Sequence, residues 1–587
     1  MRVRVRVKLQ TLTVTVSRVH RGLNYFHAHI REALVVIADN IAACVTRCYA
    51  QIVCSVSGDE EDSKMKYIIG CTVFFLIVFV DMQTHADIFY LNDKTDLPDA
   101  NPGDGVALTA NGTTTLRAAI EEANALPGKH KIVFTYGASG KRGNDKDAYR
   151  VGVAHLTAPL FVTGDLIIDK GNFPRAHIRP IGSDQFRVLE VLPGARLEMI
   201  GIHIAESLPL VQHMVSDRGA AIYIRPSAEV ILRNCEIQSG VATVAGGGIY
   251  VDRGMLTLRT FSYVSGYSEG DGGGVYNDRG VVRVYRGSGL IGTAQGRGGG
   301  LFNHHGYVIF SPSGSDTLLY RGRAVLGGSL FAEGGHVVLR AVSIEANEAA
   351  YGGAIYVADD AYFEVSGSSF SANSATAHGG AMYIESGVAR VSNCTFGRGY
   401  YLRVNTAGNS GGAIYVNEGN ITLQNCTIME NTAGGTGAGE GGGLTVNPGG
   451  RALCRIGNTV IAENTTAFDQ TKSDVLGTIV SLGRNLIGVA EGATGYVESD
   501  LLGSLTTPLN PLLEHRGQHE GRPESPGNIY VPQAGSPVID AGDNALLSHP
   551  DFVGGACFDA RMTCCPRVRG AAVDIGARAA LRRLGLG

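Results

Sequence analysis

The stretch SGGAIYVNEGNITLQNCTIMENTAGG, Ser410–Gly435, contains a unit that recurs through most of this 587-residue chain. Apolar residues alternate with polar ones in its segments, and glycine or asparagine follows each segment. Alternation over about 4–8 residues predicts a β-strand with one buried face, and it excludes an amphipathic helix. The stretch therefore predicts three short strands joined by turns.

The same unit recurs at a nearly constant interval. When the copies are aligned on the apolar residue that follows the glycines, successive copies lie 25 to 32 residues apart. The aligned residues are Ile222, Ile249, Val275, Leu301, Leu330, Ile355, Met382, Ile414 and Leu444. A period of about 20–50 residues indicates a solenoid, in which each unit buries its apolar face against its neighbours. Three strands per unit predict an all-β, right-handed parallel β-helix of roughly a dozen coils between Ile132 and about Ile487.

The composition agrees with a turn-rich all-β chain. The chain has 81 glycines, which lie largely between the alternating segments, and only 18% of its residues are charged. The formal net charge of −4 is not that of a nucleic-acid-binding protein, so we expect no nucleic-acid partner. We also expect no cofactor and no metal site.

A secretory signal peptide is predicted at residues 65–86. A lysine precedes an apolar run at residues 67–80, and a small-residue cleavage site ends at Ala86. The run is shorter than the roughly 20 apolar residues that span a bilayer, so no transmembrane helix is expected in the mature chain. We expect translation to begin at Met65, which makes residues 1–64 a non-native upstream extension. A genuine basic N-terminal extension is the alternative.

Two sets of residues in the repeat are predicted to be structural. Cys235, Cys394 and Cys426 occupy one slot of the third strand, where other coils have Phe261, Val342, Ser368 or Thr459. A metal or redox site would not accept such replacements, so we expect these cysteines to stack in the core. The third strand is closed by Asn347, Asn373, Asn431 and Asn464. Asparagine at a corner satisfies backbone groups and tolerates left-handed geometry, so it needs no ligand.

An aromatic stripe follows the aligned aliphatic residues. It comprises Tyr223, Tyr250, Tyr276, Phe302, Phe331, Tyr356, Tyr383 and Tyr415. Because neighbours in a strand point to opposite faces, an inward Ile414 sends Tyr415 outward. The stripe would then form a ladder of rings on which sugars stack. The candidate binding residues are Tyr250, Tyr276, Tyr356, Tyr383 and Tyr415. The alternative is that the rings point inward or stack only on one another.

An acidic series lies just beyond the aromatic stripe. It comprises Asp252, Asp278, Glu333, Asp359, Asp360, Glu385 and Glu418. Carboxylates on neighbouring coils would lie about 5 Å apart, close to the separation in a retaining glycosidase. The sequences DRG, ESG and NEG are also ordinary turns, in which the acid accepts backbone hydrogen bonds and glycine supplies a positive φ. We favour the turn interpretation and assign no catalytic residue.

Three parts of the chain resemble known bacterial families. The GGAIY units that close on asparagine, as in FSAN (Phe370–Asn373) and IMEN (Ile428–Asn431), resemble the repeats of polymorphic outer membrane proteins. The segment TTTLRAAIEEAN (Thr113–Asn124) resembles the CSLREA domain that often precedes such helices. The segments AGSPVIDAGD (Ala534–Asp543) and VDIGA (Val573–Ala577) are similar to the choice-of-anchor Q domain. These resemblances imply export and surface association, with no established activity.

The mature chain is predicted to divide into three regions. Residues 87–131 hold a strand and a helix that ends near Gly128 and covers the first coil. The apolar stripe of this helix comprises Leu116, Ala119, Ile120 and Ala123. The β-helix occupies residues 132–490, and a choice-of-anchor-like region at residues 491–587 covers the other end.

Three cysteines lie close together in the segment CFDARMTCC. In an exported protein, a disulfide from Cys557 to Cys564 or Cys565 is favoured over a metal site.

The predicted function is that of an exported surface or secreted scaffold or adhesin of a bacterial envelope, with polysaccharide or host glycans as partners. The alternative is a polysaccharide lyase or glycoside hydrolase on a pectin-lyase-like β-helix. The Gly-His-Gly and Arg-Ile-Lys motifs expected of a polygalacturonase do not occur in the sequence, and arginines are scattered along it. We therefore favour a binding protein.

Overall fold

A computed structural model describes residues 86–135, 152–182, 184–205, 214–311, 317–399, 403–434, 441–466, 474–516, 529–548 and 570–577. The predicted upstream extension at residues 1–64 lies outside these ranges, as does the predicted signal peptide except for its last residue, Ala86. The predicted disulfide among Cys557, Cys564 and Cys565 also lies outside them.

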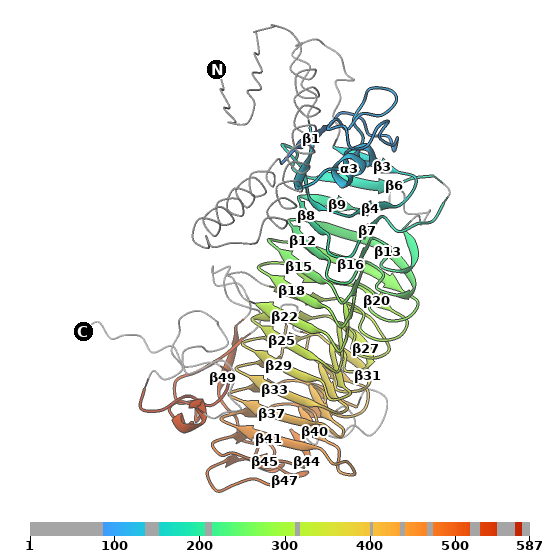
Figure 1. The fold of residues 1–587 in the computed structure, drawn as a ribbon. Coiled ribbons are helices and arrows are strands. Elements are labelled where there is room, and N and C mark those ends of the chain that lie inside the picture. Colours follow the sequence, from blue (N-terminus) through green and yellow to red (C-terminus); the bar gives the residue numbers. More distant parts are fainter. Residues whose placement is uncertain are drawn as a thin grey trace, which may run out of the picture. The chain divides into compact units, whose positions relative to one another are not determined.

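The described chain forms a parallel β-helix in which each coil contributes one strand to each of three sheets (Figure 1). We number the sheets in the order in which the chain passes through them in the unit Ser410–Gly435. Sheet 1 carries the aromatic stripe, and sheets 2 and 3 follow it. Every pairing within them is parallel and joins a strand to its counterpart in the next coil. The predicted right-handed parallel β-helix is confirmed, and the fourteen strands of sheet 2 in the described part are close to the dozen coils expected.

Sheet 1 consists of β4 (Leu160–Val162), β7 (Leu189–Val191), β11 (Ile222–Ile224), β14 (Ile249–Asp252), β17 (Val275–Asp278), β21 (Leu301–His304), β24 (Leu330–Glu333), β28 (Ile355–Ala358), β32 (Met382–Ile384), β36 (Ile414–Val416), β40 (Leu444–Val446), β44 (Val475–Thr478) and β47 (Ala493–Thr494). Sheet 2 consists of β1 (Ile88–Leu91), β2 (Lys129–Phe134), β5 (Asp165–Asp169), β8 (Arg196–Ile200), β12 (Glu229–Arg233), β15 (Met255–Arg259), β18 (Val281–Tyr285), β22 (Tyr307–Ser311), β25 (His336–Arg340), β29 (Tyr362–Ser366), β33 (Val388–Ser392), β37 (Asn420–Gln424), β41 (Leu453–Gly457) and β45 (Val480–Ser481).

Sheet 3 consists of β3 (Val153–Leu156), β6 (Ala176–Pro180), β9 (Ile202–Ile204), β13 (Glu236–Ala245), β16 (Tyr263–Ser268), β19 (Gly289–Leu290), β23 (Thr317–Tyr320), β26 (Val342–Glu345), β30 (Ser369–Ser371), β34 (Thr395–Gly397), β38 (Thr427–Met429), β42 (Val460–Ala462), β46 (Leu486–Ile487) and β48 (Leu501–Leu502), with β10 (Val215–Arg218) and β20 (Thr293–Ala294) paired at its side. A small sheet follows sheet 3 in five coils: β27 (Glu348–Tyr351), β31 (Ser374–His378), β35 (Thr406–Ala407), β39 (Thr432–Ala433) and β43 (Thr465–Thr466).

The interior of the coils is a continuous apolar core. Alternate residues of each sheet point inward, as Ile414 and Val416 do in β36, where both are fully buried. The largest buried side chains are phenylalanines, among them Phe310, Phe363 and Phe396. This inward set is the one that the alternating pattern predicts.

The cysteine slot is confirmed, with one correction. Cys235, Cys394 and Cys426 are all buried, and no disulfide joins them. Phe261, however, does not occupy the slot: Ser262 does, and Phe261 is 47% exposed. Thr260 and Phe261 both adopt positive φ values of 50° and 56°, so this turn has one residue more than the turn at Asn234. Because of this additional residue, alignment of the sequence repeats puts Phe261 in the slot where the structure has Ser262.

The closing asparagines form a buried hydrogen-bonded ladder. The Nδ2 group of Asn347 donates to Oδ1 of Asn373 at 2.9 Å, and Asn373, Asn405, Asn431 and Asn464 continue the series at 2.8 to 2.9 Å. Asn405 is a member that the sequence analysis missed. The positive φ angles lie one residue earlier than expected, at Ala346, Ala372, Glu430 and Glu463. The ladder asparagines bind one another and backbone carbonyls, as a corner role requires.

Additional elements pack on the first coils and on the side of the later coils. Helix α3 (Leu116–Ala125) is capped by Thr115, whose Oγ1 accepts from Ala118 N at 3.0 Å, and all four residues of its predicted stripe are buried. The hairpin of β49 (Leu513–Arg516) and β50 (Ile529–Pro532) contacts the side of the coils, because Tyr530 Oη donates to Glu430 (2.5 Å) near β38. The short 3₁₀ helix η1 (Asn544–Ser548) lies beside Gln424, which donates to the carbonyl oxygen of Leu546. The region boundaries predicted from sequence stay predictions.

In the described ranges, no helix is both long enough and apolar enough to cross a membrane.

Candidate functional site

The predicted tyrosines lie together on sheet 1 in a single stack of rings. The aligned aliphatic residues point inward and the aromatic ones point outward, and the rings stack on one another, as the alternative interpretation of the stripe predicted. From Tyr223 to Tyr415, successive ring centroids are 4.7 to 5.2 Å apart. Beyond the tilted Tyr223–Tyr250 pair, neighbouring rings lie within 19° of parallel. We call this stack the aromatic ladder.

The faces of the ladder rings are occupied by other rings. Phe302 is fully buried, and Tyr250, Tyr356 and Tyr383 are 6 to 8% exposed, whereas Tyr276 and Tyr415 are half-buried. Side chains from the preceding corner also cover the ladder, since Tyr351 packs edge-on against Tyr383 and His378 lies 4.5 Å from Tyr415. A sugar therefore meets ring edges and hydroxyl groups here, not open faces. Binding by these tyrosines stays a prediction.

The ladder hydroxyls act as hydrogen-bond donors to the acidic series. Tyr250 donates to Asp278 at 3.3 Å, and Tyr356 donates to Glu385 at the same distance. Burial raises the pKa of Tyr276 to about 12, and burial together with a nearby carboxylate raises the pKa of Tyr250 and Tyr356 still further. These phenols stay protonated at physiological pH, so they are donors and not bases.

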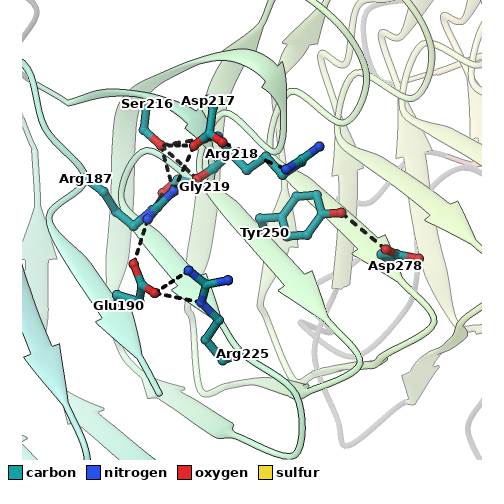
Figure 2. Close-up of polar contacts among 9 residues, drawn as sticks. All are labelled: Arg187, Glu190, Ser216, Asp217, Arg218, Gly219, Arg225, Tyr250 and Asp278. Carbon is teal, nitrogen blue, oxygen red and sulfur yellow. Dashed lines mark hydrogen bonds and ion pairs between the residues drawn. The ribbon is translucent and has the colours of Figure 1, made fainter. Parts of the chain in front are cut away.

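The ladder ends at a network of arginines and carboxylates (Figure 2). Glu190 holds the ladder position before Tyr223 and accepts from Arg187 at 2.7 Å and from Arg225 at 2.6 Å. The two guanidinium groups lie 4.7 and 4.1 Å from the centroid of the Tyr223 ring. They close the end of the ladder through cation–π contacts.

Arg187 also binds residues 216–219, the segment that precedes β11. Its Nη2 donates to Ser216 Oγ, to Asp217 Oδ1 and to the carbonyl oxygen of Arg218, at 2.8 to 3.0 Å (Figure 2). Its Nε donates to the carbonyl oxygens of Arg218 and Gly219. Because these contacts engage the nitrogens of Arg187, the network fixes residues 216–219 against sheet 1, which is a structural role.

The acidic series binds side chains where backbone amides were expected. Asp278 accepts from His304 Nδ1 and from Arg279 Nε, both at 3.0 Å, and Glu333 accepts from Arg297 at 2.7 Å. Burial alone would raise the pKa of Asp278, but its hydrogen bonds to His304 and Arg279 hold the pKa below its ordinary value. A retaining glycosidase needs one carboxyl group kept protonated, and Asp278 is held ionised.

The structure contains a cleft that the sequence did not indicate. Its volume is about 920 Å³, and it lies at the corner where sheet 3 leads into the small sheet. It is lined by Thr293, Tyr320, Arg321, Arg323, Glu345, Ala346, Glu348, Ser371, Ala372, Gly399 and Arg403. Arg321, Ala346 and Ala372 have positive φ angles, so the same sharp turn on three successive coils forms one wall. We call this site the arginine cleft.

Arginine is the main charged residue of the cleft. The Arg321 guanidinium packs 4.8 Å from the Tyr320 ring centroid, and Arg323 pairs with Glu348 at 3.1 Å with both side chains more than half exposed. Arg403 lies in the insertion between β34 and β35. Three arginines thus meet two glutamates in one open concavity, a setting that suits a ligand with carboxylate or sulfate groups.

A half-buried clasp fixes the C-terminal hairpin beside this cleft. Arg398 makes three of its contacts. Its backbone N donates to Tyr530 Oη at 3.0 Å, and its guanidinium pairs with Glu430 at 2.6 Å. Its carbonyl oxygen accepts from His515 Nε2 at 2.9 Å. Burial, with Glu430 alongside, raises the pKa of Tyr530 well above its usual value. Gly399, the next residue, lines the cleft.

One sequence signal points to the cleft in retrospect. The interval from Met382 to Ile414 is 32 residues, the longest in the repeat, and its extra residues carry Arg403 to the same corner as Arg321 and Arg323. Arginines that look scattered along the chain come together because the coils stack. In the described residues, no three His, Cys, Asp or Glu side chains are grouped to hold a metal ion.

Comparison with known families supports the fold. Residues 327–480 match the family model described as right handed beta helix region. A chain described as the crystal structure of pectate lyase Pel9A aligns at 10% identity and a TM-score of 0.26, covering 85% of this chain and 97% of that chain. No curated protein matches. The resemblances to CSLREA, polymorphic outer membrane and choice-of-anchor proteins stay predictions.

Proposed function

We propose that this chain is an exported β-helix protein that binds acidic polysaccharides in the arginine cleft and serves as a surface scaffold or adhesin. The observation that carries the proposal is the convergence of Arg321, Arg323 and Arg403 on one cleft of about 920 Å³. Guanidinium groups pair with carboxylates in two-pronged geometry, so uronate sugars are the ligands of matching chemistry.

The proposed location rests on the sequence. Residues 65–86 have the charged, apolar and small-residue segments of a secretory signal, and a bacterial cell surface is where polysaccharides are met. The formal net charge of −4 makes non-specific attraction of polyanions to the whole protein weak, so retention would come from a local site.

The test is retention of the full-length protein on immobilised polygalacturonate. We expect binding that weakens with salt, because paired charges in an open cleft are screened. The double variant R323Q/R403Q should bind about tenfold more weakly, which corresponds to about 1.4 kcal/mol. The matched control is R253Q, since Arg253 is also exposed and pairs with one carboxylate, Asp252, but lies outside the cleft.

Two results would contradict the proposal. Equal retention of the wild-type protein and the cleft variant would show that the cleft is not the binding site. New reducing or unsaturated ends in the polygalacturonate would replace the binding function with a polysaccharide-degrading enzyme, and their loss in R323Q/R403Q would place that activity in the cleft.

A further inference from the structure

A second row of aromatic rings lies on sheet 2, on a surface that neither the ladder nor the cleft includes. Tyr307, His336 and Tyr362 are the first residues of β22, β25 and β29, and they pair directly across the sheet. Their ring centroids are 6.5 and 5.4 Å apart. We call these three residues the sheet 2 row.

The rings of the sheet 2 row are open where those of the ladder are closed. Tyr307 is 40% exposed and His336 is exposed, while Tyr362 is half-buried. Neighbouring rings are tilted by 38° and 41°, so they do not cover one another's faces as the parallel ladder rings do. Rings with open faces are the ones on which the apolar face of a sugar packs.

The outward face of sheet 2 around the row carries more arginine than acid. In the five described strands from β18 to β33, the outward positions hold Arg283, Arg340 and Arg390 against a single acid, Glu364, and the exposed Asp359 and Asp360 lie in the turn before Tyr362. Arg340 pairs with Glu364 at 3.2 Å and is itself 45% exposed. Along the strands beyond the row, the face therefore complements a ligand that carries negative charge.

Arg390 connects the charge to the rings. Its Nη1 donates to the Tyr362 hydroxyl at 2.9 Å, and its guanidinium lies 5.4 Å from the Tyr362 ring centroid. The guanidinium lies over one face of the Tyr362 ring, so it leaves the other face for a sugar ring and places a charged donor next to it.

We propose that the sheet 2 row is a second contact for an acidic polysaccharide, with sugar rings packed on Tyr307 and Tyr362 and sugar carboxylates paired with Arg340 and Arg390. The ligand class is that of the proposed function, on which this inference rests, but the surface is separate. Two contacts on one chain raise the retention of a long polymer above that of either contact alone.

The test measures binding of the full-length protein to polygalacturonate, to its methyl-esterified form and to a single-stranded oligonucleotide. The double variant Y307A/Y362A should bind polygalacturonate about tenfold more weakly, or 1.4 kcal/mol. R390Q should weaken binding to polygalacturonate more than binding to the methyl-esterified polymer, since only the former carries carboxylates. The matched control is Y90A, because Tyr90 is 57% exposed and lies on β1 of the same sheet, away from the row.

The same measurements in the R323Q/R403Q background separate the two surfaces. Loss of the remaining binding on adding Y307A/Y362A supports the row, whatever the cleft contributes. Unchanged binding of Y307A/Y362A in both backgrounds overturns the row and leaves the cleft proposal standing. Binding of the oligonucleotide in place of the polysaccharide overturns both, and so does a wild-type protein that binds no polygalacturonate.

Discussion

Replacing Asp474 by asparagine is expected to abolish a pH dependence in the stability of the last coils. Asp474 ends the asparagine ladder, where its Oδ1 accepts from the backbone N and the Nδ2 of Asn464, both at 2.9 Å. Its Oδ2 accepts from Val489 N at 2.7 Å. Burial raises the pKa of Asp474 to about 7, although these three donors act in the opposite direction.

The sign and size follow from the two pKa values. An ordinary aspartate titrates at 3.8, so the folded state binds the proton more tightly than the unfolded state does. The stabilisation by this proton is fully present below pH 3.8 and is lost as the pH rises through about 7. Between pH 5 and pH 8 the opening free energy of these coils should fall by roughly 2.5 kcal/mol, at 1.36 kcal/mol for each pKa unit.

Hydrogen exchange read by mass spectrometry isolates this effect, because a solenoid opens locally from its ends. After correction for intrinsic exchange, protection of the segments that contain Asn464 and Val489 should fall about 60-fold from pH 5 to pH 8. In D474N the same segments should show protection that is independent of pH. The control D500N should keep the wild-type dependence, since Asp500 accepts from Asn485 in the same manner but belongs to the separate row that continues the cysteine slot through Thr459 and Asn485. Wild-type protection that stays flat or rises toward pH 8 would refute this reasoning.

Three further predictions concern the coil architecture. N405A leaves two buried donors without their acceptor and should cost roughly 2–4 kcal/mol in chemical denaturation, whereas the exposed N420A should be neutral. G412A should prevent soluble folding, because its methyl group would overlap a backbone oxygen of the next coil, while G449A, whose nearest neighbour is 3.8 Å away, should express normally. Burial raises the pKa of Cys454 to about 12, so maleimide should label this thiol only after denaturation.

The sequence predicts the fold well because each coil contacts only its neighbours, so short-range patterns determine the structure. Period-two alternation sets which side chains point inward, and the repeat interval sets which residues stack. The same rules predict that Cys394 and Cys426 are buried neighbours, which the structure confirms. They fail at Phe261, where a turn with one additional residue changes the register and no periodic signal marks the change.

The candidate sites are less accessible to sequence because they depend on the corners. Arg321 and Arg403 are 82 residues apart in the chain, and only the stacked coils and the insertion before β35 bring them to one cleft. The alternation places the ladder tyrosines outward but does not tell whether a neighbouring segment covers them.

The length of the adjoining corner decides which outward rings are open. The corner that leads into sheet 1 is long enough to form the small sheet, and its residues Tyr351 and His378 pack on the ladder. The turn that leads from sheet 1 into sheet 2 is only two residues long at Gly334 and Gly335, so it has no side chain to lay over the ring of His336. In the described coils that carry the small sheet, the covered rings therefore lie on sheet 1 and the open ring of His336 lies on sheet 2, and the spacing between consecutive strands carries that information in the sequence.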